Sequence, residues 1–247
     1  MKRTVLVLLA AGLLPAGADA QLMAPDNTPW GPRVRLTPFV GQAPTVSRSE
    51  RWNVFANGFS QTSAADVDLG AGPALGAVLE VRAVERFSFV ASGMYISRGR
   101  TREFSSLAGQ VLDFPGSNFL IGRAGVAMRL REPVSELQFR QLSASVFAGP
   151  AFIHEMPQSD PLASPIFLES LNHWGANFGL EAEIPTAWPS VALTAGIEDF
   201  VVFWNDTESG RRADNFAALD GFVTETVVDS DPSHMLVFRA GLSLRLQ

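Results

Sequence analysis

Hydrophobic and polar residues alternate in eight stretches of the chain, and alternation with a period of two is typical of β-strands that have one apolar face. The stretches are residues 33–42, 67–82, 87–97, 118–130, 140–153, 173–184, 190–203 and 234–247. Their lengths, 10–16 residues, suit strands that cross a lipid bilayer at a tilt. In the last stretch Leu236, Phe238 and Leu242 lie on one face, opposite Arg239 and Arg245.

The connections between these stretches alternate between short and long. The short ones are 83–86, 131–139 and 185–189, and the long ones are 43–66, 98–117, 154–172 and 204–233. Bacterial outer-membrane barrels have short periplasmic turns and longer outer loops. The pattern therefore predicts an all-β fold, an eight-stranded antiparallel up-and-down transmembrane β-barrel over residues 21–247. Within the last long connection, FAALDGFV is a candidate short helix or rim segment.

The N-terminus has the three-part layout of a secretory signal peptide. Lys2 and Arg3 precede an apolar run from Val5 to Leu14, and Ala18-Asp19-Ala20 forms a small-residue cleavage site. We expect residues 1–20 to be removed during export and the protein to reside in the cell outer membrane.

Composition narrows the function classes. Removal of Lys2, Arg3 and Asp19 with the signal peptide leaves 17 arginines, no lysine, 24 acidic residues and a formal net charge of −7. An acidic chain offers no basic patch for nucleic acid. The absence of cysteine excludes a disulfide framework and thiolate metal ligands. We expect no metal or cofactor.

The polar faces of the stretches mix opposite charges with small residues, which suits the interior of a narrow barrel. Because buried charges need partners, we expect a mutually paired network that plugs the lumen, although a gate or small ion path is an alternative. Glu80, Glu181, Glu183 and Glu198 have to supply the acidic partners. The predicted lumenal charges are Arg35, Glu80, Arg82, Arg123, Arg129, Glu181, Glu183, Glu198, Arg239 and Arg245.

Tryptophans lie near the ends of the predicted strands, as in the aromatic girdles of membrane proteins. We assign Trp30 and Trp188 to the periplasmic rim, and Trp174 and Trp204 to the outer rim. Three prolines each remove a hydrogen-bond donor inside a predicted strand, so bulges or extended strand ends are expected there. These are Pro38, Pro73 and Pro150.

Few residues offer catalytic chemistry. His154, His173 and His234 fall at the predicted outer rim, where we expect them to face water or lipid headgroups. Lipid A acyl hydrolases built on eight-stranded barrels carry a His-x-Ser pair, but here Gly175 follows His173 at the serine position. Ser233 and His234 are adjacent on a strand and point to opposite faces. We therefore predict no catalytic residues.

The signal peptide, the opening strand LTPFVG, the eight amphipathic stretches and the closing strand resemble the small outer-membrane β-barrel superfamily. This superfamily includes the OmpA-type transmembrane domain and its opacity-protein and OmpW-like relatives. The resemblance implies a monomer whose partners are outer-membrane lipids, lipopolysaccharide and the barrel-assembly machinery. Two departures are the end at Leu246-Gln247, where an aromatic residue is common, and the absence of a following peptidoglycan-binding domain.

The sequence thus predicts an outer-membrane barrel with a structural or surface-interaction role and no enzymatic activity. Alternatives are a narrow channel or carrier for small solutes, a lipid A-modifying enzyme, and a secreted soluble ligand-binding barrel. The acidic connection 204–233 is interpreted as a solvated loop, with cation or partner binding as its alternative.

Overall fold

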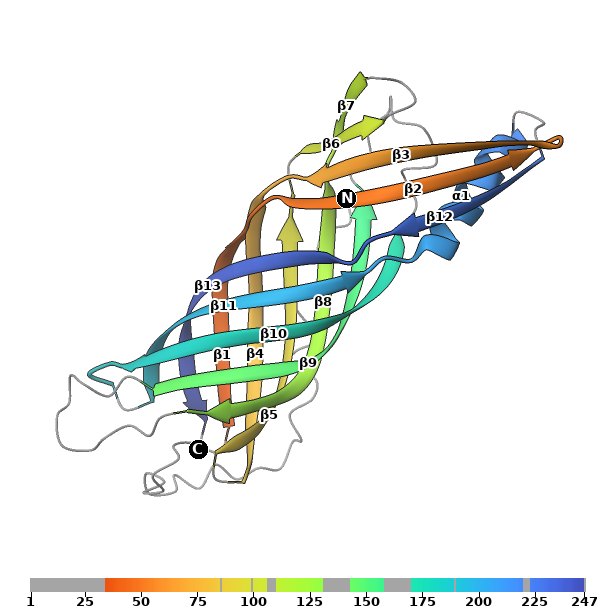
Figure 1. Ribbon diagram of the computed structural model, residues 1–247. Coiled ribbons are helices and arrows are strands. Elements are labelled where there is room, and N and C mark those ends of the chain that lie inside the picture. The colour runs from red at the N-terminus through yellow and green to blue at the C-terminus, as the bar shows by residue number, and fades with distance from the viewer. Residues whose placement is uncertain are drawn as a thin grey trace, which may run out of the picture.

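The computed structural model describes residues 34–84, 86–98, 100–105, 110–130, 143–157, 170–188, 190–219 and 223–246. The predicted signal peptide and Trp30 lie outside these residues. Eight strands close into an antiparallel barrel, which confirms the predicted fold class (Figure 1). They are β1 (Val34–Ala43), β4 (Gly72–Val84), β5 (Phe87–Ser97), β8 (Ser117–Arg129), β9 (Ser143–Pro157), β10 (Leu171–Pro185), β11 (Val191–Phe203) and β13 (Ser233–Leu246).

The barrel is of the up-and-down type, because each barrel strand pairs with the next barrel strand along the chain. The seam between β1 and β13 closes it, with Val34 opposite Leu246 and Gln42 opposite Phe238. We call the rim where β1 begins and β13 ends the terminal rim, and the opposite one the distal rim. No helix in the described part of the chain is long and apolar enough to cross a membrane.

Side chains alternate between the two faces of the barrel wall as the sequence predicts. In β13, Leu236 and Phe238 lie exposed on the outer surface, whereas Val237 and Arg239, which alternate with them, are buried in the lumen. In β5, Phe89 and Tyr95 point outward and Met94 points inward. The alternation of 87–97 is hard to recognise in the sequence because both faces of this strand are apolar.

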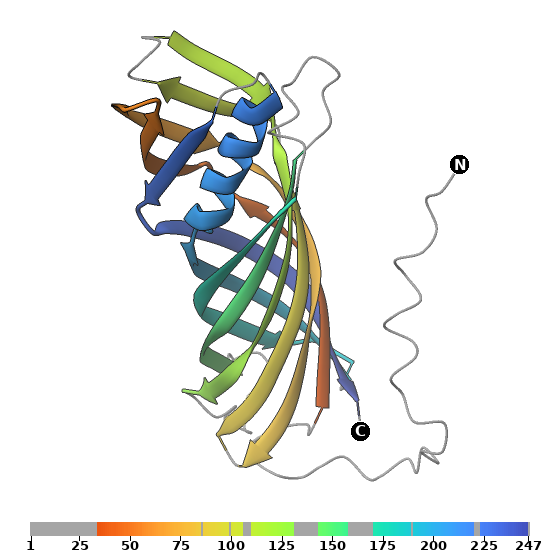
Figure 2. The same ribbon diagram turned by 90° about the vertical axis from the view of Figure 1, so that its right-hand side faces the viewer.

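A second sheet stands on the distal rim, and this corrects the prediction of long loops (Figures 1 and 2). Its strand order is β12-β2-β3-β6-β7. The strands are β2 (Val46–Ala56), β3 (Phe59–Leu69), β6 (Arg100–Ser105), β7 (Gln110–Pro115) and β12 (Thr224–Ser230). Connections 43–66, 98–117 and 204–233 are therefore largely structured. The predicted strand 67–82 is also wrong, because it divides into the end of β3 and the start of β4.

Helix α1 (Asp206–Leu219) packs against β12. It begins where the side chain of Asn205 accepts a hydrogen bond from the Glu208 backbone N–H, as an N-cap does. Gly210 allows close packing, since a Cβ at this position would clash with the Thr226 carbonyl oxygen. Asp206 accepts hydrogen bonds from the backbone N–H and the hydroxyl of Ser230. The helix thus covers part of an edge strand, which would otherwise offer unpaired backbone groups. The predicted helical segment FAALDGFV overlaps only the end of α1.

Arg98 fixes the junction between the barrel and the second sheet. Its side chain is buried, and its Nη1 atom donates to the carbonyl oxygens of Pro44, Leu69 and Gly70 at 2.9, 3.2 and 2.7 Å. These carbonyls lie where β1 leads into β2 and where β3 leads into β4. Burial lowers the pKa of Arg98 to about 10, so the guanidinium stays charged at neutral pH.

The strand prolines produce no bulge. The register between β1 and β13 is the same before and after Pro38, with Leu36 opposite Leu244 and Phe39 opposite Gly241. The register of β8 and β9 is likewise unchanged across Pro150, and Pro73 is the second residue of β4. The one register shift among the described barrel pairs falls between Arg82 and Val84. A missing donor therefore interrupts the ladder locally without displacing the strand.

Candidate functional site

Charged side chains from six barrel strands meet in the part of the lumen nearer the terminal rim. Arg35 of β1 forms ion pairs with Glu80 of β4 and Glu183 of β10, and its Nη2 atom lies 3.5 Å from Glu181 Oε1. All four side chains are at most a tenth exposed. One arginine thus connects carboxylates from strands on both sides of the barrel seam.

Arg239 of β13 is the second centre of this group. Its Nη2 atom lies 2.7 Å from Glu181 Oε2, and its Nε atom lies 2.7 Å from Glu198 Oε1. Arg123 of β8 reaches the same Glu198 oxygen at 3.1 Å. Both arginines contact the ring of Phe147, with its centroid 4.2 Å from Arg123 Cζ and 5.6 Å from Arg239 Cζ. Cation–π contacts of this kind stabilise desolvated guanidinium groups.

Two further arginines complete the group nearer the terminal rim. Arg245 Nη2 lies 2.7 Å from Glu183 Oε1, and Arg129 Nη2 lies 3.9 Å from Glu80 Oε1. Arg82, also predicted to be lumenal, is half-buried on the inward face of β4. We call the nine connected residues the lumenal ion network: Arg35, Glu80, Arg123, Arg129, Glu181, Glu183, Glu198, Arg239 and Arg245.

Beyond the ion network, toward the distal rim, the lumen is filled by apolar side chains. Sequence reasoning missed this layer, because it assigned a polar character to the whole interior. Its members form one packed cluster with residues of the second sheet such as Val46 and Leu69. The lumenal members nearest the distal rim are Ile96, Phe119, Ile121, Ile153, Phe200, Val202, Met235 and Val237.

A third, polar group lies at the distal rim under the second sheet. His173 Nε2 is 3.0 Å from Glu155 Oε2, and His173 Nδ1 accepts a hydrogen bond from the Asn205 backbone N–H at 3.1 Å. The second contact fixes the proton on Nε2 in the neutral ring. Trp204 packs edge-on against His173, and the Arg48 guanidinium of β2 lies 4.3 Å above the Trp204 ring. This group attaches the second sheet to the barrel.

The arrangement of the histidines corrects one prediction. His173 is buried inside the barrel, whereas His154 and His234 lie on the outer surface near the distal rim. The inward position follows from alternation, since Trp174 next to His173 points outward. Both ring nitrogens of His173 are engaged and Gly175 follows at the serine position, so this stretch has no nucleophile–base pair. Ser233 is buried inside and His234 is exposed outside, as opposite faces require.

Of the tryptophans predicted to form aromatic girdles, two are exposed near the rims and one is packed inside the barrel. Trp174 is exposed on the outer surface of β10, and Trp188 is 70% exposed in the turn between β10 and β11. Trp204 does not belong to an outer girdle, because it packs against the apolar cluster and donates to the Ser233 hydroxyl at 3.0 Å. It shares the inward face of Phe200 and Val202, so period-two alternation already indicates its direction.

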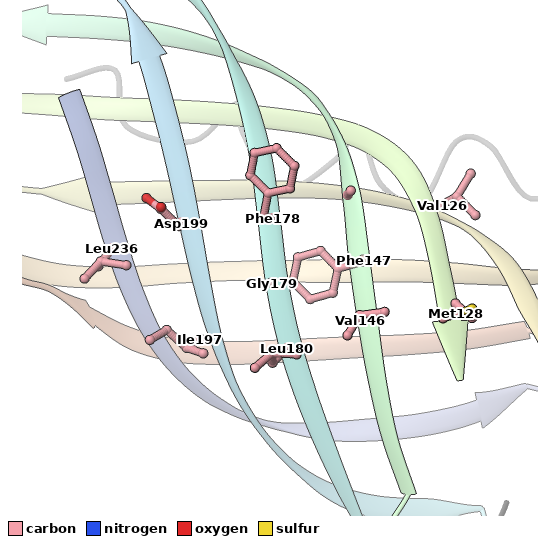
Figure 3. A pocket seen from close by; sticks show the side chains of 11 residues that line it. Val126, Met128, Val146, Phe147, Phe178, Gly179, Leu180, Ile197, Asp199 and Leu236 are labelled. Atoms are coloured by element: carbon pink, nitrogen blue, oxygen red, sulfur yellow. The ribbon is translucent and has the colours of Figure 1, made fainter. Parts of the chain in front are cut away.

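The outer surface of the barrel carries an apolar groove of about 500 Å³ (Figure 3). It crosses β8, β9, β10, β11 and β13. Outward side chains of two neighbouring cross-strand rows border it, and Asp199 is the charged residue among them. The lining residues are Val126, Met128, Val146, Phe147, Ala148, Phe178, Gly179, Leu180, Ile197, Asp199 and Leu236.

Comparison with solved structures gives the fold a wider context. The barrel is similar to the outer membrane protein OprG from Pseudomonas aeruginosa, with 12% identity, a TM-score of 0.57 and coverage of 88% of this chain and 98% of OprG. The fold is that of a small outer-membrane β-barrel. This confirms the predicted resemblance at the level of the fold.

Two other matches are more distant. Ail of Yersinia pestis, solved with the heparin analogue sucrose octasulfate, is 12% identical over 83% of this chain and 99% of Ail, with a TM-score of 0.34. The outer membrane protease OmpT from Escherichia coli is 8% identical over 85% of this chain and 96% of OmpT, with a TM-score of 0.40. No family model matches the chain, and no curated protein matches it.

Proposed function

We propose that this protein is an outer-membrane β-barrel whose lumen is closed by the lumenal ion network and the apolar layer, and whose role is to present the second sheet at the cell surface. The barrel acts as an anchor, without catalysis and without conducting solutes. To present the second sheet outside the cell, the barrel has to be inserted with its terminal rim toward the periplasm and its distal rim outward. This orientation is the one expected for a barrel with short periplasmic turns.

The apolar outer surface of the barrel supports the proposal that the protein spans a membrane. Exposed apolar side chains cover every barrel strand, among them Val40, Leu75, Phe89 and Leu193. A water-soluble protein rarely exposes contiguous apolar surface on this scale, whereas lipid covers it without cost. Trp174 and Trp188 are exposed near opposite rims, where interfacial tryptophans are found.

The observation that carries the closed lumen is the lumenal ion network. Its ion pairs connect β1, β4, β8, β10, β11 and β13, so they extend across the interior rather than along one side. An aqueous pore would leave these side chains hydrated, yet Arg239 and Glu198 are each 2% exposed. Eight-stranded barrels enclose about enough space for side chains alone.

The second sheet supports a surface role. Its face away from α1 is polar, with Ser47 bonded to Asp68 and Ser49 bonded to Asp66. The hairpin between β2 and β3 turns at Asn57 and Gly58, both with positive φ, which is typical of a tight two-residue turn. Phe59 beside this turn is 81% exposed. These features present an ordered polar surface with an apolar tip to the exterior.

Membrane placement is tested by fractionation. We expect the protein to remain with outer membranes after carbonate extraction and to migrate differently on gels before and after heating. Recovery of soluble protein from the periplasm would contradict the proposal.

The closed lumen is tested by conductance in planar bilayers. We expect no stepwise current for the unmodified protein. The double variant Arg239→Ala with Glu198→Ala removes the central ion pair but leaves the apolar layer in place, so we expect no openings from it either. Stepwise currents from the unmodified protein would instead support the narrow channel.

A further inference from the structure

The apolar groove on the outer surface is a hollow in the barrel wall where a small side chain lies between larger ones. Ala148 is its smallest bordering side chain, and it lies between Val126 and Phe178 in one cross-strand row. Val146 and Leu180 belong to the neighbouring row. Figure 3 shows Val126 and Phe178 of the first row and Val146 and Leu180 of the second, with the Phe147 ring beside Gly179.

Asp199 gives the groove a polar wall. It points outward, because Glu198 and Phe200 on either side of it are buried in the lumen. Its Oδ1 atom is buried and makes no hydrogen bond to any residue that the structure describes, so the accessible oxygen of this 29% exposed side chain is Oδ2, which lies 2.8 Å from Nδ1 of the exposed His234. A carboxylate oxygen has two lone pairs, so Oδ2 can accept a second hydrogen bond beside that of His234, and the groove favours an occupant with a hydrogen-bond donor.

The distance of Asp199 from the distal end of β11 restricts which part of a bound lipid can carry the hydrogen-bond donor. Val201 and Phe203 continue the outward face of β11 beyond Asp199. Four residues of strand correspond to about 13 Å along β11, so Asp199 lies below the end of the strand. A lipid headgroup at the rim is therefore too high to donate to it. The donor belongs to the upper part of an acyl chain.

We propose that the groove binds one β-hydroxyacyl chain of lipopolysaccharide, with the chain along Ala148 and Phe178 and its hydroxyl donating to Asp199. His234, nearer the rim and exposed, donates from Nδ1 to Asp199 and so orients the carboxylate. A phospholipid chain has the same apolar body but lacks the hydroxyl. This inference rests on the proposed membrane placement, since only there does lipid surround the outer wall.

The test measures binding of lipid A and of phosphatidylethanolamine to the purified full-length protein by native mass spectrometry. Lipid A is expected to bind one to one and at least about tenfold more tightly than phosphatidylethanolamine, which lacks the acyl hydroxyl that donates to Asp199. Because the two lipids also differ in headgroup and chain number, the Asp199→Leu variant isolates the contribution of this hydrogen bond. Equal binding of the two lipids to the unmodified protein would overturn the assignment.

Variants locate the site. Ala148→Phe and Leu180→Trp each fill the groove, and each is expected to weaken lipid A binding at least about tenfold. Ala77→Phe places the same bulk on the outward face of β4, across the barrel, and is the matched control. Asp199→Leu is expected to reduce lipid A binding to the level of phosphatidylethanolamine without changing the latter. Unchanged lipid A binding in Ala148→Phe and Leu180→Trp would refute the site.

The two proposals fail separately. A protein that fractionates with the outer membrane but binds lipid A equally in all variants loses only the groove assignment. A protein recovered as soluble loses the proposed function as well. Heat-modifiable migration of each variant confirms that the barrel has folded before its binding is compared.

Discussion

Replacement of Arg239 by leucine is the most direct test of the lumenal ion network. The arginine is 2% exposed and holds two carboxylates, Glu181 and Glu198, each at 2.7 Å. Removing one partner of a buried ion pair costs about 3–5 kcal/mol, because it leaves a buried charge uncompensated. Glu198 keeps Arg123 at 3.1 Å and Glu181 keeps Arg35 at 3.5 Å. We therefore expect a loss near the lower end of that range, about 3 kcal/mol.

The measurement is the free energy of unfolding in urea, followed by tryptophan fluorescence in lipid vesicles. Arg211→Leu is the matched control, since Arg211 pairs with Glu208 on the surface of α1 and its side chain is 55% exposed. Exposed pairs contribute at most about 1 kcal/mol, so this variant should unfold nearly as the unmodified protein does. If Arg239→Leu and Arg211→Leu lowered stability equally, the lumenal arginine would be hydrated and the closed lumen would be wrong.

Three other substitutions examine separate parts of the fold. Leu242→Arg places a charge on the outer face of β13 and should cost about 2–4 kcal/mol in vesicle unfolding, whereas Leu242→Ala should cost less; equal losses would contradict lipid contact. Gly210→Val should displace α1 from β12 because its side chain meets the Thr226 carbonyl, and faster proteolysis of residues 206–230 with the barrel intact would report it. Arg98→Met leaves three junction carbonyls without their donor, so the β2–β3 hairpin should exchange its amide hydrogens faster, and unchanged exchange would count against the junction role.

The barrel was predictable because its strands carry a simple physical signal. Lipid outside and a packed lumen inside impose an apolar and a mixed face on each strand, and a period of two follows from strand geometry. The same alternation gives the inward direction of Arg35 and Arg239, so the residues of the ion network can be selected from the sequence. The partners of each arginine depend on strand tilt and register, which no local pattern contains.

The second sheet was not predictable by the same reasoning. SRSERWN in β2 and SQTSAADVD in β3 have polar residues on both faces, since one face meets water and the other meets a partly polar group. Without an apolar face they resemble loops. Their strand structure comes from pairing with distant segments, such as Arg51 with Asp229. The apolar layer of the lumen was missed for a related reason, because a strand that is apolar on both faces loses its alternation.

The seam of the barrel continues beyond the distal rim. β1 leads into β2 and β12 leads into β13, so the β1–β13 pairing and the β2–β12 pairing form one continuous line of contact between the two ends of the chain. Contacts between segments so far apart in sequence are slow to form. Completion of the second sheet thus depends on a segment close to the end of the chain. Until β12 is in place, β2 is paired with β3 on one side and open on the other, and the β2–β12 pairing brings the start of β13 to the seam.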